Sequence, residues 1–189
     1  MIQRITKDPG FWFLLLMNSY LIYYYQQQPG EFNTIIWIYW LQSVLIGVFN
    51  FLELLFVKNP DSASLSINSQ PVTKSSMGCA AWFFLFHFGF FHFVYAIFLL
   101  VGKSSGVNAK LLLITAGIFV AESTIQFIRK RNTLQPGKVN VGRMFFTPYL
   151  RIVPMHLMIL LPSFLGIAGS VVFLILKTVA DAGMYLLTT

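Results

Sequence analysis

Ionisable residues inside long apolar segments are the feature that most limits how this chain can fold. Only 10% of its 189 residues are charged, whereas 57% are hydrophobic. Ionisable groups at membrane depth are costly, so they face a protein interior or a water-filled cavity and by default mark a functional site. Those inside the apolar segments are His87, His92, Glu122, His156, Lys177 and Asp181. The pattern therefore predicts a membrane protein with a buried polar centre.

The composition argues against other classes of protein. The 20 Phe and the other apolar residues provide more apolar surface than a soluble domain of this length can bury, which makes hydrocarbon the natural solvent. The net charge of +7 does not predict a nucleic-acid partner, because the cations flank apolar segments as in ordinary membrane topology. The single Cys79 excludes an intramolecular disulfide. We expect residues 1–189 to form one transmembrane domain.

The apolar segments predict six helices, since a helix needs about 20 apolar residues to cross a bilayer. The last 40 or so residues are too long for one crossing, and Gly166–Ser170 is expected to turn the chain. Pro154 and Pro162 are expected to kink the helix before that turn. The predicted helices are Phe11–Tyr25, Asn33–Val57, Met77–Val101, Val107–Ile128, Thr147–Leu165 and Ser170–Leu187. The predicted fold class is all-α, a polytopic bundle of six transmembrane helices; the alternative is five helices with a long, broken final segment.

Lys and Arg are distributed unequally between the two sides of this predicted bundle. Lys103 and Lys110 fall on one side, and nine others fall on the opposite side. The nine are Arg4, Lys7, Lys58, Lys74, Arg129, Lys130, Arg131, Lys138 and Arg143. Because cytoplasmic loops carry the excess of Lys and Arg, both termini are predicted to be cytoplasmic. We expect the basic Arg129–Arg143 loop to contact anionic lipid of the bilayer.

Four of the buried ionisable groups are predicted to share one layer of the membrane. With a rise of about 1.5 Å per residue, each falls within about 6 Å of the midplane of its helix. They are His87, Glu122, His156 and Asp181. Two His and two carboxylates suit a divalent transition metal such as zinc, iron or manganese. The same set can relay protons, or place a general base beside an acid.

A second layer of polar residues surrounds this predicted site: His92, Lys177, Gln42 and Asn50. Some of these residues have simpler interpretations. A His among Phe residues is often a hydrogen-bonded core His, and Lys177 and Asp181, at i and i+4, can neutralise each other. The chain has no HExxH, HxxxH or CxxC pattern, so the metal hypothesis depends on convergence between helices.

Four blocks of sequence carry a resemblance to a known family. They are Tyr39–Ser43 with Ile46–Asn50, Phe84–His92, Pro148–Ile152 with His156, and Leu176–Thr178 with Asp181. Together they resemble a family of uncharacterised bacterial integral membrane proteins, grouped as a domain of unknown function. The resemblance implies a six-helix fold and a bacterial inner membrane, and it implies no activity. In that family an acidic residue stands where this chain has Gln42, and often a His where it has Glu122.

The function expected from the sequence is a small inner-membrane protein with a membrane-embedded His/carboxylate site that binds metal and acts on a lipid-borne substrate. The first alternative is a small transporter or proton-coupled carrier, in which Pro154, Pro162 and the buried charges line a path. Six short helices make a small transporter, so that alternative predicts a homo-oligomer. The second alternative is a structural or partner-binding membrane subunit. The sequence does not decide whether the chain is an enzyme.

Overall fold

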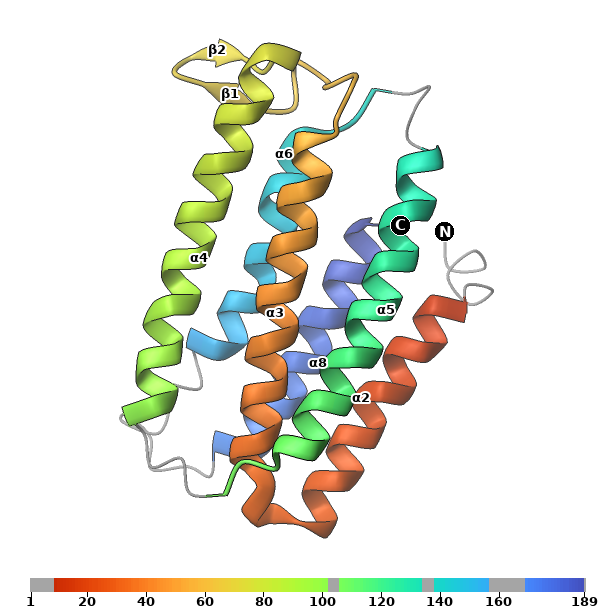
Figure 1. Cartoon of the computed structure of the whole chain (residues 1–189), viewed down its shortest axis with the longest axis vertical. Helices are drawn as coiled ribbons and strands as arrows, with labels where there is room; N and C mark the ends of the chain where they lie inside the picture. Colours follow the sequence, from red (N-terminus) through yellow and green to blue (C-terminus); the bar gives the residue numbers. More distant parts are fainter. Residues whose placement is uncertain (1–8, 102–105, 134–137, 157–168, 189) are drawn as a thin grey trace.

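The computed structural model describes residues 9–101, 106–133, 138–156 and 169–188, which form an elongated helical bundle (Figure 1). These ranges hold six α-helices: α2 (Pro9–Gln27), α3 (Phe32–Leu55), α4 (Met77–Val101), α5 (Ala109–Thr133), α6 (Val141–Phe146) and α8 (Gly169–Thr188). Three short 3-10 segments join them, η1 (Pro29–Glu31), η2 (Lys74–Ser76) and η3 (Thr147–Arg151). The described residues are therefore mostly helical, in line with the predicted helical fold class.

One small hairpin interrupts the helical pattern, between α3 and α4. Strands β1 (Ser66–Ile67) and β2 (Gln70–Pro71) pair antiparallel, with Ile67 opposite Gln70. Asn68 and Ser69 join the strands and both have positive φ, as a two-residue type I′ turn requires. The segment between α3 and α4 thus contains both a hairpin and η2.

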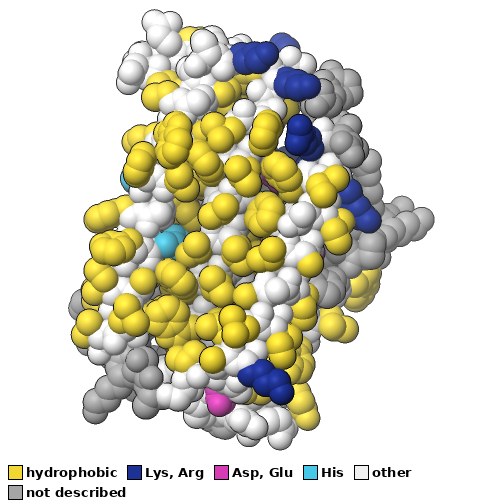
Figure 2. All heavy atoms as spheres, in the orientation of Figure 1, with side chains coloured by type: hydrophobic (Ala, Val, Ile, Leu, Met, Phe, Trp, Pro, Cys, Tyr) yellow, Lys and Arg dark blue, Asp and Glu magenta, His cyan; other side chains and the backbone are white. Residues whose placement is uncertain are grey.

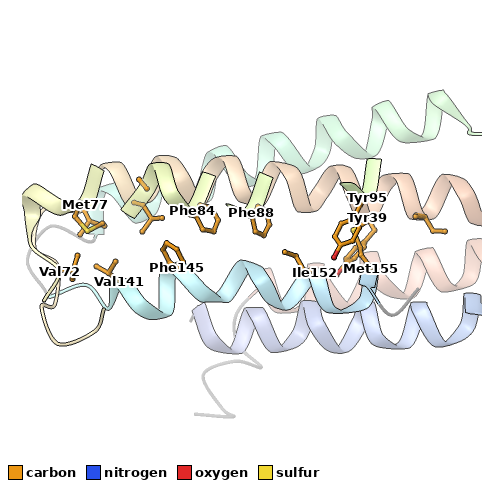
Figure 3. Close-up of a cluster of buried hydrophobic side chains, with 14 of the residues drawn as sticks. Tyr39, Val72, Met77, Phe84, Phe88, Tyr95, Val141, Phe145, Ile152 and Met155 are labelled. Atoms are coloured by element: carbon orange, nitrogen blue, oxygen red, sulfur yellow. The ribbon is translucent and has the colours of Figure 1, made fainter. Parts of the chain in front are cut away.

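The helix α3 is the centre of the bundle, because α4 packs on one of its sides and α5 on another (Figure 1). The α6–η3 segment also contacts α3, and α8 packs against η3 and α2. Figure 3 shows the apolar core as a row of side chains along the bundle, from Val72 and Met77 at one end to Tyr95 and Met155. This arrangement leaves most of α4 and α5 facing outward.

Three of the described helical segments are long and apolar enough to cross a membrane. They are Phe32–Leu55, Lys74–Val101 and Ala109–Arg131. Large apolar side chains point outward from them, such as Phe86, which is 72% exposed. Figure 2 shows apolar side chains over the middle of one face, with Lys and Arg gathered toward one end. These features are compatible with a membrane protein, and six crossings stay a prediction.

The fifth predicted helix, Thr147–Leu165, is the main departure from expectation. The helix starts earlier, at Val141, because the side chain of Asn140 accepts a hydrogen bond from the backbone N–H of Arg143 and caps it. It then tightens into the 3-10 turn η3, where Pro148 has no N–H to continue the α-helical pattern, and residues 152–156 are α-helical again. Residues 157–168, which include Pro162 and most of the predicted turn, lie outside the described residues.

The basic segment after α5 also differs from its prediction. The helix α5 runs to Thr133, so Arg129, Lys130 and Arg131 lie in its last turns and not in a loop. Cations at the C-terminal end of a helix are favoured by its dipole, which explains the extension. Lys130 also forms an ion pair with Glu53 of α3, at 3.2 Å between Nζ and Oε1.

Candidate functional site

Three charged side chains are fully buried together in the bundle. The Nη1 atom of Arg151 lies 2.5 Å from Oδ1 of Asp181, and Nζ of Lys177 lies 2.7 Å from Oδ2 of the same carboxylate. Arg151 is only 3% exposed, Lys177 2% and Asp181 4%. Two cations thus share one carboxylate, and this buried charged cluster has a formal charge of about +1.

Polar neighbours from two other helices complete the buried charged cluster. Lys177 donates to the side-chain oxygen of Asn18 on α2, at 2.7 Å. Arg151 donates through Nη2 to the side-chain oxygen of Gln42 on α3, at a long 3.4 Å. Within the described residues, Nε of Arg151 has no hydrogen-bond partner. The cluster therefore joins α2, α3, η3 and α8, and still has donor capacity left.

The ring of Tyr39 lies against both cations of the cluster. The guanidinium carbon of Arg151 is 4.4 Å from the ring centroid, and Nζ of Lys177 is 5.2 Å from it. The Tyr39 hydroxyl donates to the backbone carbonyl of Arg151 at 3.1 Å, which fixes the end of η3 against α3. A ring face attracts a desolvated cation, so Tyr39 partly offsets the excess positive charge.

The local sequence explains how these side chains meet. Lys177 and Asp181 are one turn apart on α8, so both point to the same face of that helix. Arg151 is the last residue of η3, where the 3-10 turn changes the direction in which side chains leave the backbone. Because α8 packs against both η3 and α2, its charged face is enclosed by these elements.

The buried charged cluster lines a cavity of about 150 Å³. The helix α5 also lines this cavity, through polar residues that include Glu122, Ser123 and Gln126. Glu122 accepts a hydrogen bond from the side-chain amide of Gln126, at 3.1 Å. The apolar part of the lining comes from Met17, Leu21, Ile46, Ile118, Phe119 and Met184. The cavity is therefore lined by α2, α3, α5, η3 and α8, and it combines charged with apolar walls.

The three His residues lie at three different places, each with its own partner. His87 is exposed, and its Nδ1 lies 2.8 Å from the hydroxyl of Tyr149. His156 makes a similar contact of 2.9 Å with the hydroxyl of Tyr95. His92 is buried, with Nδ1 at 2.9 Å from the Phe88 carbonyl and Nε2 at 2.8 Å from the hydroxyl of Ser43. Since a carbonyl only accepts, Nδ1 of His92 carries a proton.

The structure therefore does not bring the four predicted metal ligands together. Glu122 and Asp181 line the same cavity, and His87 and His156 do not line it. In the part of the chain that is described, no group of three or more His, Cys, Asp or Glu could hold a metal ion. Equal predicted depth in the membrane did not correspond to a common site, because His87 points outward from α4.

The predicted second layer is also divided between places. Lys177 and Gln42 belong to the buried charged cluster, and Lys177 forms the expected i, i+4 ion pair with Asp181. His92 is a core His bonded to its own helix and to α3, as its simpler interpretation proposes. Asn50 is buried on α3, and its Nδ2 has no partner among the described residues.

Three residues of the site were not found from the sequence: Arg151, Tyr39 and Asn18. Arg151 falls near the start of a predicted helix, where an Arg is expected at the membrane interface. Asn18 gave the clearest missed signal, because it is a polar side chain inside the first apolar segment. Tyr39 and Arg151 both lie in blocks that carry the family resemblance, but nothing in their residue types or spacing indicates a role at the site.

The fold and the site define a class: an α-helical protein with helices long enough to cross a membrane and a charged cavity between them. The chain belongs to DUF6498, a family of unknown function, whose model matches residues 2–188. The resemblance to an uncharacterised family is thereby confirmed, while a bacterial origin and six crossings stay predictions. No curated protein and no solved structure is significantly similar to the chain.

Proposed function

We propose that the chain is a multi-pass protein of the bacterial inner membrane that carries a small polar ligand, which binds in the cavity beside Arg151. The observation that supports this proposal is that Arg151, Lys177 and Asp181 line a cavity of about 150 Å³. Charges buried only for assembly would be enclosed by packed side chains on every side. Ionisable groups that line a cavity at membrane depth are typical of a substrate path.

The broken segment around Arg151 also favours a carrier. Transporters commonly place their binding site where a membrane helix is interrupted, because the interruption leaves backbone groups available and allows movement. Here the 3-10 turn η3 separates α6 from the helical residues 152–156, and Arg151 is its last residue. The metal-dependent alternative lacks this kind of support, because its two His ligands lie away from the cavity.

Uptake by reconstituted protein tests the carrier function. Proteoliposomes are expected to accumulate at least one of four labelled probes: alanine, propionate, ethylamine and propionamide. Ser123→Leu places a larger side chain in the cavity lining and should lower that uptake by about tenfold or more, the equivalent of about 1.4 kcal/mol. The matched control is Thr124→Leu, one residue along α5 and exposed outside the cavity, which should leave uptake unchanged. Uptake no faster than by empty liposomes for all four probes would overturn the carrier proposal.

We also expect the end of the bundle that contains Lys138 to face the cytoplasm, and to contact anionic lipid there. The support is the excess of Lys and Arg in the segments at this end. The native Cys79 is exposed, so labelling needs a Cys79→Ser background. In intact cells a membrane-impermeant thiol reagent should label Gln28→Cys, in the turn between α2 and α3, and leave Lys138→Cys unlabelled. The reverse pattern would contradict the orientation.

A further inference from the structure

One wall of the cavity is cationic and can bind an anionic group. Arg151 and Lys177 share the single carboxylate of Asp181, so one positive charge is in excess. Lys177 donates to Asn18 and Asp181, and these bonds take two of its three N–H donors. This wall therefore has an excess positive charge, and one N–H donor of Lys177, to attract a carboxylate.

The α5 wall of the same cavity is anionic. Glu122 lines the cavity, and its hydrogen bond comes from Gln126, which is neutral. Among the described residues no Lys or Arg forms an ion pair with Glu122, since the cation further along α5, Lys130, pairs with Glu53. Glu122 is therefore an acceptor for an ammonium group that enters the cavity.

The two walls together determine which net charge the cavity can hold. With Arg151, Lys177, Asp181 and Glu122 ionised, the charges of the described residues in the lining sum to zero. A bound monoanion or monocation would then leave one buried charge without a counter-charge, which is strongly unfavourable in a low-dielectric interior. A ligand with no net charge but with separated charges satisfies both walls. The apolar lining, which includes Leu21 and Phe119, suits a short apolar group on that ligand.

We infer that the ligand is a small free zwitterion of the α-amino acid type, with its carboxylate toward Arg151 and Lys177 and its ammonium toward Glu122. This inference rests on the proposed carrier function. A cavity of about 150 Å³ takes a molecule roughly the size of benzene, so it suits a short aliphatic amino acid and not a phospholipid headgroup with its chains. Glu122, which the sequence suggested as a metal ligand, instead selects the ammonium.

The uptake probes separate this inference from the carrier function itself. Propionate is alanine without the ammonium, ethylamine is alanine without the carboxylate, and propionamide carries no charge. Proteoliposomes with the native chain are expected to take up alanine at least about tenfold faster than each of the other three, as a free-energy difference of about 1.4 kcal/mol would give. Faster uptake of propionate, ethylamine or propionamide than of alanine would contradict the inference of a zwitterionic ligand, while the proposed carrier function would still hold.

A conservative variant tests the role of Glu122 directly. Glu122→Gln keeps the shape of the side chain and removes the negative charge, so the ratio of alanine to propionate uptake should fall by about tenfold or more. Glu53→Gln is the matched control, because it also removes one carboxylate but lies outside this cavity, and its ratio should stay that of the native chain. An unchanged ratio in Glu122→Gln would overturn the assignment of the ammonium to Glu122.

Discussion

Asp181→Asn should be the most destabilising single substitution in the buried charged cluster. It removes the carboxylate that both Arg151 and Lys177 contact, and these two residues are only 3% and 2% exposed. Breaking a buried pair by removing one partner costs about 3–5 kcal/mol, because the remaining charge is left uncompensated. Here two cations would be left, so we expect a loss at the upper end of that range.

Replacing either cation should destabilise the chain less than replacing the carboxylate of Asp181. Lys177→Met leaves Arg151 with Asp181, and Arg151→Met leaves Lys177 with Asp181, so each variant retains a neutral pair. The free energy of unfolding of each variant can be measured in mixed micelles with a rising fraction of denaturing detergent. Val179→Ala is the control, because Val179 is an exposed residue on the same helix. If Lys177→Met loses as much free energy of unfolding as Asp181→Asn, the excess positive charge of the cluster is not the controlling factor.

Because Arg151 is a third charge in the cluster, it changes the stability expected of a variant in which both Lys177 and Asp181 are replaced. If Lys177 and Asp181 formed an isolated pair, replacing both would be milder than replacing either one, with a coupling of about 0.5–3 kcal/mol. In the structure Arg151 also depends on Asp181, at 2.5 Å. The double variant Lys177→Met with Asp181→Asn should therefore be less stable than Lys177→Met alone. A double variant more stable than Lys177→Met would indicate that Arg151 does not need Asp181.

The sequence predicted the helices well where apolar segments end at clear polar boundaries. Met77–Val101 has the same bounds in the prediction and in the structure, and Phe32–Leu55 differs from its prediction by one residue at its start and two at its end. These bounds follow from local chemistry, since the apolar segment stops where polar residues or Pro begin. The fifth helix was less accurate, because its start depends on the cap at Asn140 and its centre on Pro148.

The sequence could not predict how each helix is rotated about its own axis, and therefore which of its faces is buried. In α4, apolar residues occupy every face, so the pattern does not show that His87 points outward while His92, five residues later, points to α3. Depth along the membrane normal is one coordinate of three, and it grouped Glu122 and Asp181, which line one cavity, with two His residues that do not line it. Arg151 was missed because a tertiary contact, and no local pattern, buries it against Tyr39 and α8.

The close approach of α3 and α4 gives the second large prediction: Gly47→Ala should destabilise the chain by about 1–3 kcal/mol, the usual range for overpacking a core. A Cβ at residue 47 would lie 2.5 Å from Cε1 of Phe88. That ring cannot move away easily, because it is 3% exposed and stacks on Phe84 with a centroid distance of 5.1 Å. The same detergent unfolding series measures the loss.

Gly89→Ala is the matched control for Gly47→Ala, since a Cβ at residue 89 of α4 would meet no atom within 4 Å. It should be neutral or stabilise the helix by about 0.5–1 kcal/mol, because Ala restricts the unfolded chain more than Gly. Replacing Phe88 with Leu in the Gly47→Ala background should recover part of the loss, since the ring that the new methyl group meets is gone. Equal stability of Gly47→Ala and Gly89→Ala would mean that α3 and α4 do not pack this closely, and that the contact between Ser43 and His92, one turn away, needs another explanation.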